Sequence, residues 1–107
     1  MADLAAVPDA RLLSWLAMTA QSGASDLFLL AGAPPTVKNR GEFHPLSAQP
    51  LQAQQVRELA LSLLTPTQRQ EFELKQERDL ALEAPGVGRF RVNLLFQRGT
   101  VGLVARY

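Results

Sequence analysis

Apolar residues recur at helical spacing near the start of the chain. The stripe consists of Leu12, Leu13, Leu16, Ala17 and Ala20, and Trp15 and Met18 widen it. Pro8 and Asp9 precede it, and proline suits a first helical turn while an acid there complements the helix dipole. Gly23 follows, as glycine commonly does just past a helix end. The pattern predicts a helix that opens at Pro8 and Asp9 and ends at Gly23.

Short apolar segments separated by turn residues come next. Residues 25–30 are predicted to form a strand, which the adjacent prolines at 34 and 35 end because proline cannot donate to a ladder. Residues 36–38 and 42–46 flank the sequence Asn39-Arg40-Gly41, in which Asn and Gly can adopt a positive φ. These two segments are predicted to form a hairpin.

Helical periodicity then returns twice. Residues 51–64 are predicted to form a second helix, whose buried face carries Val56, Leu59, Ala60, Leu63 and Leu64. The sequence Thr65-Pro66-Thr67-Gln68 combines a threonine N-cap, a proline at the first position and a glutamine at the third. This capping box is worth about 1 kcal/mol. It begins a third helix that contains Phe72 and ends near Gln76.

The last third of the chain alternates polar and apolar residues at period two. Strands are predicted at 79–83, 89–96 and 100–107, with turns at 86–88 and near Gly99. In the middle strand Phe90, Val92, Leu94 and Phe96 share one face, and Arg89, Arg91 and Asn93 share the other. The order of helix, strands, two helices and an antiparallel meander predicts an α+β fold.

Composition limits the class of protein. The 107 residues carry a net charge of +1, which is too balanced to indicate general binding of nucleic acid or membranes. The absence of cysteine excludes disulfides and thiolate chemistry. No apolar run approaches the roughly 20 residues of a membrane span. We expect one domain over residues 1–107, and because the last strand runs into the final residue, we expect a piece of a longer protein.

Charge is distributed unevenly along the chain. Residues 71–83 carry five acidic and two basic side chains, a net charge of −3, whereas only arginines follow Glu83: Arg89, Arg91, Arg98 and Arg106. A closing segment of positive charge on strands could receive an anion. The alternative, which composition alone favours, is a solvated basic edge that deters edge-to-edge pairing.

Arg91 and Arg106 are the candidate site residues. On adjacent antiparallel strands joined near Gly99, they can come close on one face, and two guanidinium groups form a fork that suits phosphate oxygens. The chain has no G-x-x-x-x-G-K-[ST] sequence, so another domain or subunit would hold the nucleotide. From the residues alone we favour the alternative of surface ion pairs with Glu73, Glu77 or Asp79, worth at most about 1 kcal/mol each.

The other candidates are better explained by structural roles. His44 has no nearby metal-ligating or catalytic partners and is interpreted as a plain hairpin residue. Asp26 is expected to cap local backbone after Gly23. The face with Phe28 and Leu30 is assigned to the core. No nucleophile, base or metal cluster assembles, so the chain is not predicted to be an enzyme by itself.

Several motifs agree in order and spacing with one family. They are Gly23-Ala24-Ser25-Asp26-Leu27-Phe28-Leu29, Gly32-Ala33-Pro34-Pro35, Arg40-Gly41, Phe72-Glu73, Glu77-Arg78-Asp79-Leu80-Ala81-Leu82, Gly88-Arg89-Phe90-Arg91-Val92-Asn93, Gln97-Arg98-Gly99, Val104 and Arg106. From about Leu12 on, the chain resembles the type IV pilus retraction ATPases of the PilT/PilU type, within the secretion ATPase superfamily.

The resemblance implies a PAS-like N-terminal domain, an antiparallel sheet with flanking helices, followed after residue 107 by a RecA-like domain that binds ATP with Mg²⁺. Six subunits would form a cytoplasmic ring beneath the inner-membrane platform protein of the pilus, without nucleic acid. In relatives, N-terminal arginines reach the nucleotide phosphates, and Arg91 and Arg106 match them. This chain alone would hold no catalytic residue, metal or cofactor, and with the resemblance we favour phosphate binding by the pair.

Phe28 and the segment after it bear on the branch of the family. PilT-like sequences usually carry histidine at the position of Phe28. Phenylalanine there, followed by Gly32-Ala33-Pro34-Pro35-Thr36-Val37-Lys38, looks more like the PilU branch, and a paralogous PilT-type ATPase is then a further expected partner. The alternative function is a free-standing PAS-like module that binds a protein or a small ligand. A glycine-rich P-loop after Tyr107 would favour the motor.

Overall fold

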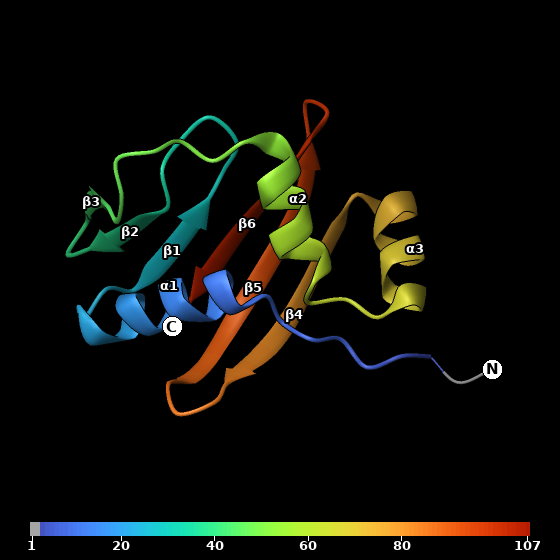
Figure 1. The fold of residues 1–107 in the computed structure, drawn as a ribbon, viewed down its shortest axis with the longest axis horizontal. Helices are drawn as coiled ribbons and strands as arrows, with labels where there is room; N and C mark the ends of the chain where they lie inside the picture. The colour runs from blue at the N-terminus through green and yellow to red at the C-terminus, as the bar shows by residue number, and fades with distance from the viewer. Residues whose placement is uncertain (1–2) are drawn as a thin grey trace.

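A six-stranded antiparallel sheet in the order β3-β2-β1-β6-β5-β4 forms the centre of the computed structural model, which describes residues 3–107. Two helices lie across one face of the sheet, and a third lies beside the β4 edge (Figure 1). The elements are α1 (Ala10–Gln21), β1 (Asp26–Leu29), β2 (Thr36–Asn39), β3 (Glu42–Pro45), α2 (Ala53–Leu61), α3 (Pro66–Lys75), β4 (Glu77–Ala84), β5 (Gly88–Gln97) and β6 (Thr100–Arg106). The α+β prediction is confirmed. Within residues 3–107, no helix is long and apolar enough to cross a membrane.

The first helix starts at Ala10, so Pro8 precedes the helix and does not lie in its first turn as predicted, while the predicted end at Gly23 is confirmed. Asp9 is its N-cap and accepts a 2.8 Å hydrogen bond from the backbone N–H of Arg11. Beyond Gln21 the chain turns at Gly23, whose φ of 74° favours glycine. The expectation that Met18 widens the buried stripe is wrong, because Met18 is 39% exposed and Thr19 is buried in its place. Thr19, not Met18, lies at the helical spacing that continues the buried stripe.

The second helix is shorter than the predicted range 51–64. Leu51 forms a bridge with Ala31, donates a 2.8 Å hydrogen bond to the Ala33 carbonyl and accepts one from Gly32. Because its backbone is committed to this loop, the helix starts only at Ala53. Leu63 and Leu64 lie beyond the helix end but are buried as expected.

The third helix has the predicted capping box. Thr65 Oγ1 accepts from the Gln68 N–H at 3.2 Å, and Gln68 Oε1 accepts from the Thr65 N–H at 2.9 Å. Phe72 is buried, and the helix ends at Lys75 because Gln76 adopts a left-handed conformation with φ 62°. Local sequence therefore sets both ends of this helix.

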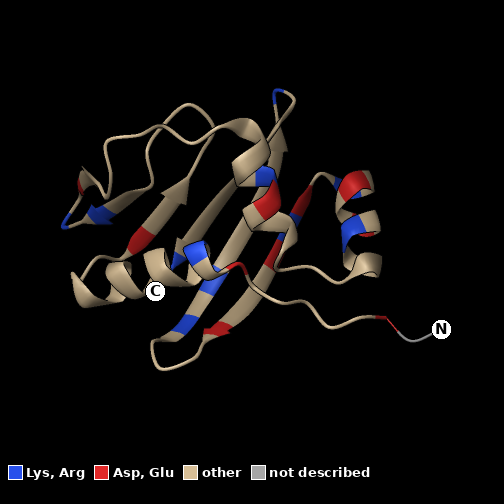
Figure 2. Ribbon diagram, viewed as in Figure 1, with Lys and Arg blue, Asp and Glu red and all other residues tan. Residues whose placement is uncertain are grey.

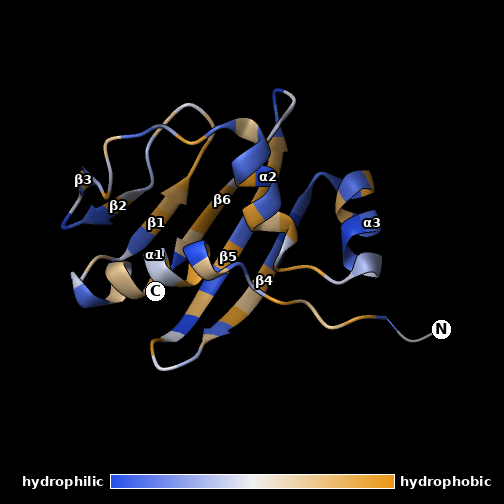
Figure 3. Ribbon diagram, viewed as in Figure 1, coloured by the Kyte–Doolittle hydropathy of each residue, from blue (hydrophilic) through white to orange (hydrophobic). Residues whose placement is uncertain are grey.

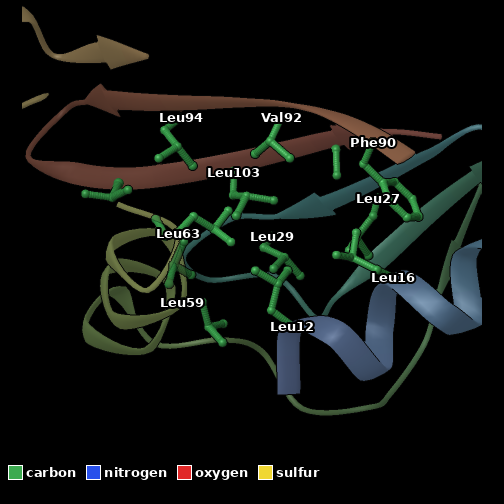
Figure 4. Packing of buried hydrophobic residues seen from close by; sticks show 14 of the residues in the cluster. Leu12, Leu16, Leu27, Leu29, Leu59, Leu63, Phe90, Val92, Leu94 and Leu103 are labelled. Carbon is green, nitrogen blue, oxygen red and sulfur yellow. The ribbon is translucent and has the colours of Figure 1, made fainter. Parts of the chain in front are cut away.

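The closing meander is present, with longer β4 and β5 strands than predicted, and β6 pairs with β1 to complete the sheet. Hydrophobic and hydrophilic positions alternate along β5 (Figure 3). Phe90, Val92 and Leu94 point toward the helices, where they pack with Leu12, Leu16, Leu59, Leu63 and Leu103 (Figure 4).

The assignment of Phe28 and Leu30 to the core is wrong. Leu27 and Leu29 are fully buried against the helices, whereas Leu30 is 42% exposed. The register explains the difference, because Leu27 lies opposite Ala105 and Leu29 opposite Leu103, both on the covered face. Phe28 and Leu30 therefore lie on the opposite face, which no helix of the described chain covers (Figure 1).

Candidate functional site

Charged side chains form a row across the uncovered face of the sheet. Arg91 of β5 lies directly opposite Arg106 of β6. Arg106 lies opposite Asp26 of β1, and Asp26 lies opposite Lys38 of β2. Residues directly opposite each other share a face, so these four side chains form one continuous line, here called the charged row. Figure 2 shows the basic and acidic positions along these strands.

The charged row has an excess of positive charge. It contains three cations and one carboxylate, and two of the cations, Arg91 and Arg106, are immediate neighbours. Like charges directly opposite in a ladder are destabilising. The predicted proximity of Arg91 and Arg106 is confirmed, because the two residues lie directly opposite each other on one face of the sheet.

Arg106 and Asp26 form the ion pair of the row. Arg106 Nε lies 3.9 Å from Asp26 Oδ2, and the Arg106 side chain is 74% exposed while that of Asp26 is 15% exposed. The carboxylate is thus held within the sheet surface, and the guanidinium extends into solvent. Asp26 was expected to cap backbone after Gly23, which is wrong, since its only polar partner in the described chain is Arg106.

The arginine pair borders a shallow hollow of about 240 Å³. Its lining comes from β1, β4, β5 and β6 and consists of Asp26, Asp79, Arg91, Val92, Asn93, Val104 and Arg106. The hollow is open to solvent.

The acids proposed as alternative partners of the arginines are engaged elsewhere. Glu73 pairs with Arg57. Glu77 and Asp79 both accept hydrogen bonds from Asn93 Nδ2, at 3.2 Å and 2.8 Å. Within residues 3–107, no carboxylate lies within 4.0 Å of the Arg91 guanidinium. The alternative pairing of Arg91 and Arg106 with Glu73, Glu77 or Asp79 is therefore wrong.

Lys38 is a charged-row residue that sequence reasoning missed. Its Nζ lies 5.7 Å from the ring centroid of Phe43, which in turn lies 5.5 Å from the Phe28 ring centroid. A cation over an aromatic face is attracted by the ring quadrupole. Only the β1–β2 register brings Lys38 beside Asp26, although the alternation of the strand places it on the outward face.

His44 lies where it was predicted, in the hairpin. It is exposed, and its Nε2 lies 3.9 Å from Glu42 Oε2. Among residues 3–107, no three His, Cys, Asp or Glu side chains gather closely enough to hold a metal ion. The charged row is thus the arrangement of polar side chains that most clearly fits a ligand.

No family model matches the chain. Two curated proteins of Pseudomonas aeruginosa are similar to it: the type IV pilus ATPase PilU, 41% identical over 91 residues, and the type IV pilus retraction ATPase PilT, 42% identical over 91 residues. Each match covers 85% of this chain, and 24% of PilU or 26% of PilT. The chain therefore spans about a quarter of the length of these relatives.

Solved structures agree with this similarity. The pilus retraction motor PilT with bound ADP superposes with a TM-score of 0.81 at 35% identity, over 90% of this chain and 28% of that chain. The Legionella pneumophila ATPase DotB superposes with a TM-score of 0.72 at 20% identity, over 90% of this chain and 28% of that chain, and shows the shared fold.

The antiparallel sheet and its flanking helices define the N-terminal domain of a secretion ATPase. Within that class, over 85% of its length the chain is a homologue of the type IV pilus ATPases PilU and PilT. The comparisons do not favour the alternative of a free-standing binding module.

Proposed function

We propose that residues 1–107 are the N-terminal domain of a hexameric cytoplasmic ATPase that powers type IV pilus retraction and twitching motility. The identity to PilU and PilT over 85% of the chain carries the proposal. A RecA-like domain would bind ATP with Mg²⁺, because this chain has no P-loop of its own. The chain itself contributes nucleotide sensing and subunit contacts and no catalytic residue.

The charged row supports a role for Arg91 and Arg106 at the nucleotide phosphates. Arg91 has no carboxylate within 4.0 Å in the described chain, and most of the Arg106 side chain is exposed. Phosphate oxygens would relieve the repulsion between the two guanidinium groups and accept charge-assisted hydrogen bonds from both. The residues present therefore fit a nucleotide phosphate group supplied by another domain.

The same contacts give a physical basis for nucleotide-dependent movement. A triphosphate offers more oxygens and more negative charge to Arg91 and Arg106 than a diphosphate does. A ligand shifts a conformational equilibrium only by its differential affinity for the two states. Stronger contact with the triphosphate would hold this domain against its ATP-binding partner, and weaker contact after hydrolysis would release it.

The proposed partners are five further copies of the protein, the inner-membrane platform protein of the pilus and a paralogous PilT-type ATPase. The last follows from Phe28, which stands where PilT-like sequences usually carry histidine and thus favours the PilU branch. The identities of 41% to PilU and 42% to PilT do not separate the two branches.

Arginine substitutions in the full-length protein test the proposal. Arg91→Ala and Arg106→Ala should each reduce ATP turnover and pilus retraction. We expect a reduction smaller than the roughly 10³- to 10⁵-fold loss seen when an arginine stabilises a phosphoryl-transfer transition state directly. Arg89→Ala is the matched control, because Arg89 lies on the same strand and face but opposite Glu83. Normal turnover and retraction in both variants of the pair would contradict the proposal.

A further inference from the structure

The ion pair between Asp26 and Arg106 uses one particular edge of the guanidinium. The contact of 3.9 Å is made by Nε, the nitrogen nearest the side-chain stem. A guanidinium has five N–H donors arranged as a planar fork, and the two terminal nitrogens carry four of them. The contact with Asp26 therefore leaves the terminal nitrogens available for another acceptor.

Asp26 is well placed to hold that edge. It lies directly opposite Arg106 in the β1–β6 ladder, so both backbones are held by the sheet. Its side chain is 15% exposed, and a carboxylate withdrawn from water to this degree is stabilised by a nearby cation. Lys38 flanks Asp26 on the other side, but its Nζ lies near the Phe43 ring, which leaves Arg106 as the ion-pair partner in the described chain.

We propose that Asp26 is a positioning residue for the nucleotide response: its carboxylate holds Arg106 by the Nε edge, so that the terminal guanidinium nitrogens face the phosphates. The proposal rests on the proposed function, since it assigns to Arg106 a phosphate partner. An arginine side chain has several rotatable bonds and is ordered at an entropic cost when it binds. Asp26 restricts Arg106 before the nucleotide arrives, so that less freedom is lost on binding.

A carboxylate could instead compete with phosphate for the same cation. Competition predicts tighter nucleotide binding when Asp26 is removed, whereas positioning predicts weaker discrimination between nucleotides. Asn at position 26 separates the two effects, because its side chain keeps an oxygen acceptor facing Nε but carries no negative charge.

The test measures the affinity of the full-length protein for fluorescent derivatives of ADP and of a slowly hydrolysed ATP analogue, both with Mg²⁺. The readout is the dissociation constant for ADP divided by that for the ATP analogue, so a high ratio means a preference for the triphosphate. Arg106→Ala should lower this ratio. Asp26→Ala should lower it by about two- to five-fold, the range of a partly exposed ion pair. Asp26→Asn should keep most of the wild-type ratio, and Asp26→Ala combined with Arg106→Ala should match Arg106→Ala alone.

Two further variants keep the test decisive. Asp26→Leu fills a similar space without an acceptor and replaces Asp26→Ala if that variant fails to fold. Glu83→Ala removes one acid from the same sheet face, opposite Arg89, and should leave the ratio unchanged.

The outcomes distinguish the two proposals. If Arg106→Ala lowers the ratio but neither Asp26→Ala nor Asp26→Leu does, the positioning role is overturned and the proposed function stands. A higher ratio in the Asp26 variants, or an equal loss in Asp26→Asn and Asp26→Ala, also overturns positioning. If Arg91→Ala and Arg106→Ala both leave the ratio unchanged, the phosphate-sensing part of the proposed function fails.

Discussion

Arg91 and Arg106 face each other directly across the β5–β6 ladder. Arg106 has Asp26 as an ion-pair partner at 3.9 Å, whereas no carboxylate in residues 3–107 lies within 4.0 Å of the Arg91 guanidinium. Two facing cations, of which only Arg106 has a carboxylate beside it, are a source of instability in the isolated fold.

Replacing Arg91 should therefore stabilise the domain. Arg91→Gln removes the repulsion with Arg106 and should raise the free energy of unfolding by roughly 0.2–1 kcal/mol. The gain should shrink at high salt, which screens exposed charges. Urea unfolding at low and high ionic strength measures both effects.

Arg89→Gln is the control for this prediction. Arg89 lies opposite Glu83, so its replacement removes an opposite-charge pair and should lower stability slightly. A loss of stability in Arg91→Gln equal to that in Arg89→Gln would show that the facing arginines do not repel each other measurably.

Leu29, the last residue of β1, and Leu30, which follows it, should differ sharply in their contribution to stability. Leu29→Ala removes a fully buried side chain and should lower the free energy of unfolding by about 2–5 kcal/mol. Leu30→Ala changes a side chain that is 42% exposed on the uncovered face and should lower it by less than about 1 kcal/mol. Urea unfolding of both variants tests which face of β1 belongs to the core, and the reverse order of losses would place Leu30 there.

The first helix should depend on the charge of Asp9. The hydrogen bond from the Arg11 side chain is the main cause that lowers the pKa of Asp9 below its ordinary value of 3.8. A carboxyl with a lowered pKa contributes stability above its ordinary pKa, and that contribution disappears as the pH falls through the lower folded value. Asp9→Ala should lower the free energy of unfolding by about 1 kcal/mol at pH 7. The difference in this free energy between wild type and Asp9→Ala should become smaller below about pH 4.

Asp9→Asn is the matched variant for the cap. Asparagine caps helices about as well as aspartate, so Asp9→Asn should keep most of the wild-type stability at pH 7. Because asparagine does not titrate, the difference in stability between Asp9→Asn and Asp9→Ala should not shrink at low pH. Chemical unfolding at pH 7 and pH 3 provides the comparison. A pH-independent gap between wild type and Asp9→Ala would exclude a contribution from the carboxylate charge.

The last residue packs over a glycine at the start of β5. Tyr107 donates a hydrogen bond to the Val87 carbonyl, and a Cβ added to Gly88 would meet the Tyr107 ring at 2.9 Å. Gly88 also has a φ of 145°, which side chains rarely adopt. Gly88→Ala should therefore lower the free energy of unfolding by more than about 1 kcal/mol.

Combining Gly88→Ala with Tyr107→Ala separates steric overlap from backbone strain. The loss caused by Gly88→Ala should be smaller when the tyrosine ring is absent, although the strain from φ remains. Thermal or urea unfolding of the four proteins gives the coupling between the two positions. If Gly88→Ala lowers the free energy of unfolding equally with and without the Tyr107 ring, the steric overlap between the new Cβ and the ring contributes nothing to the loss.

The sequence predicted part of the candidate site. Alternation along 89–96 and the turn near Gly99 were sufficient to bring Arg91 and Arg106 together, because consecutive antiparallel strands pair through a short turn. Asp26 and Lys38 could not be assigned to the same row, because they lie far from Arg106 in the chain and join it only through the β1–β6 and β1–β2 pairings.

Local sequence determined the capping box of Thr65 and Gln68, the end of α1 near Gly23 and the two faces of β5, since each depends on residues a few positions apart. Tertiary structure decided which face of β1 is buried, where α2 begins, and that Asp26 faces Arg106. Alternation distinguishes two faces of a strand, but only packing of helices and distant strands determines which face loses its contact with water.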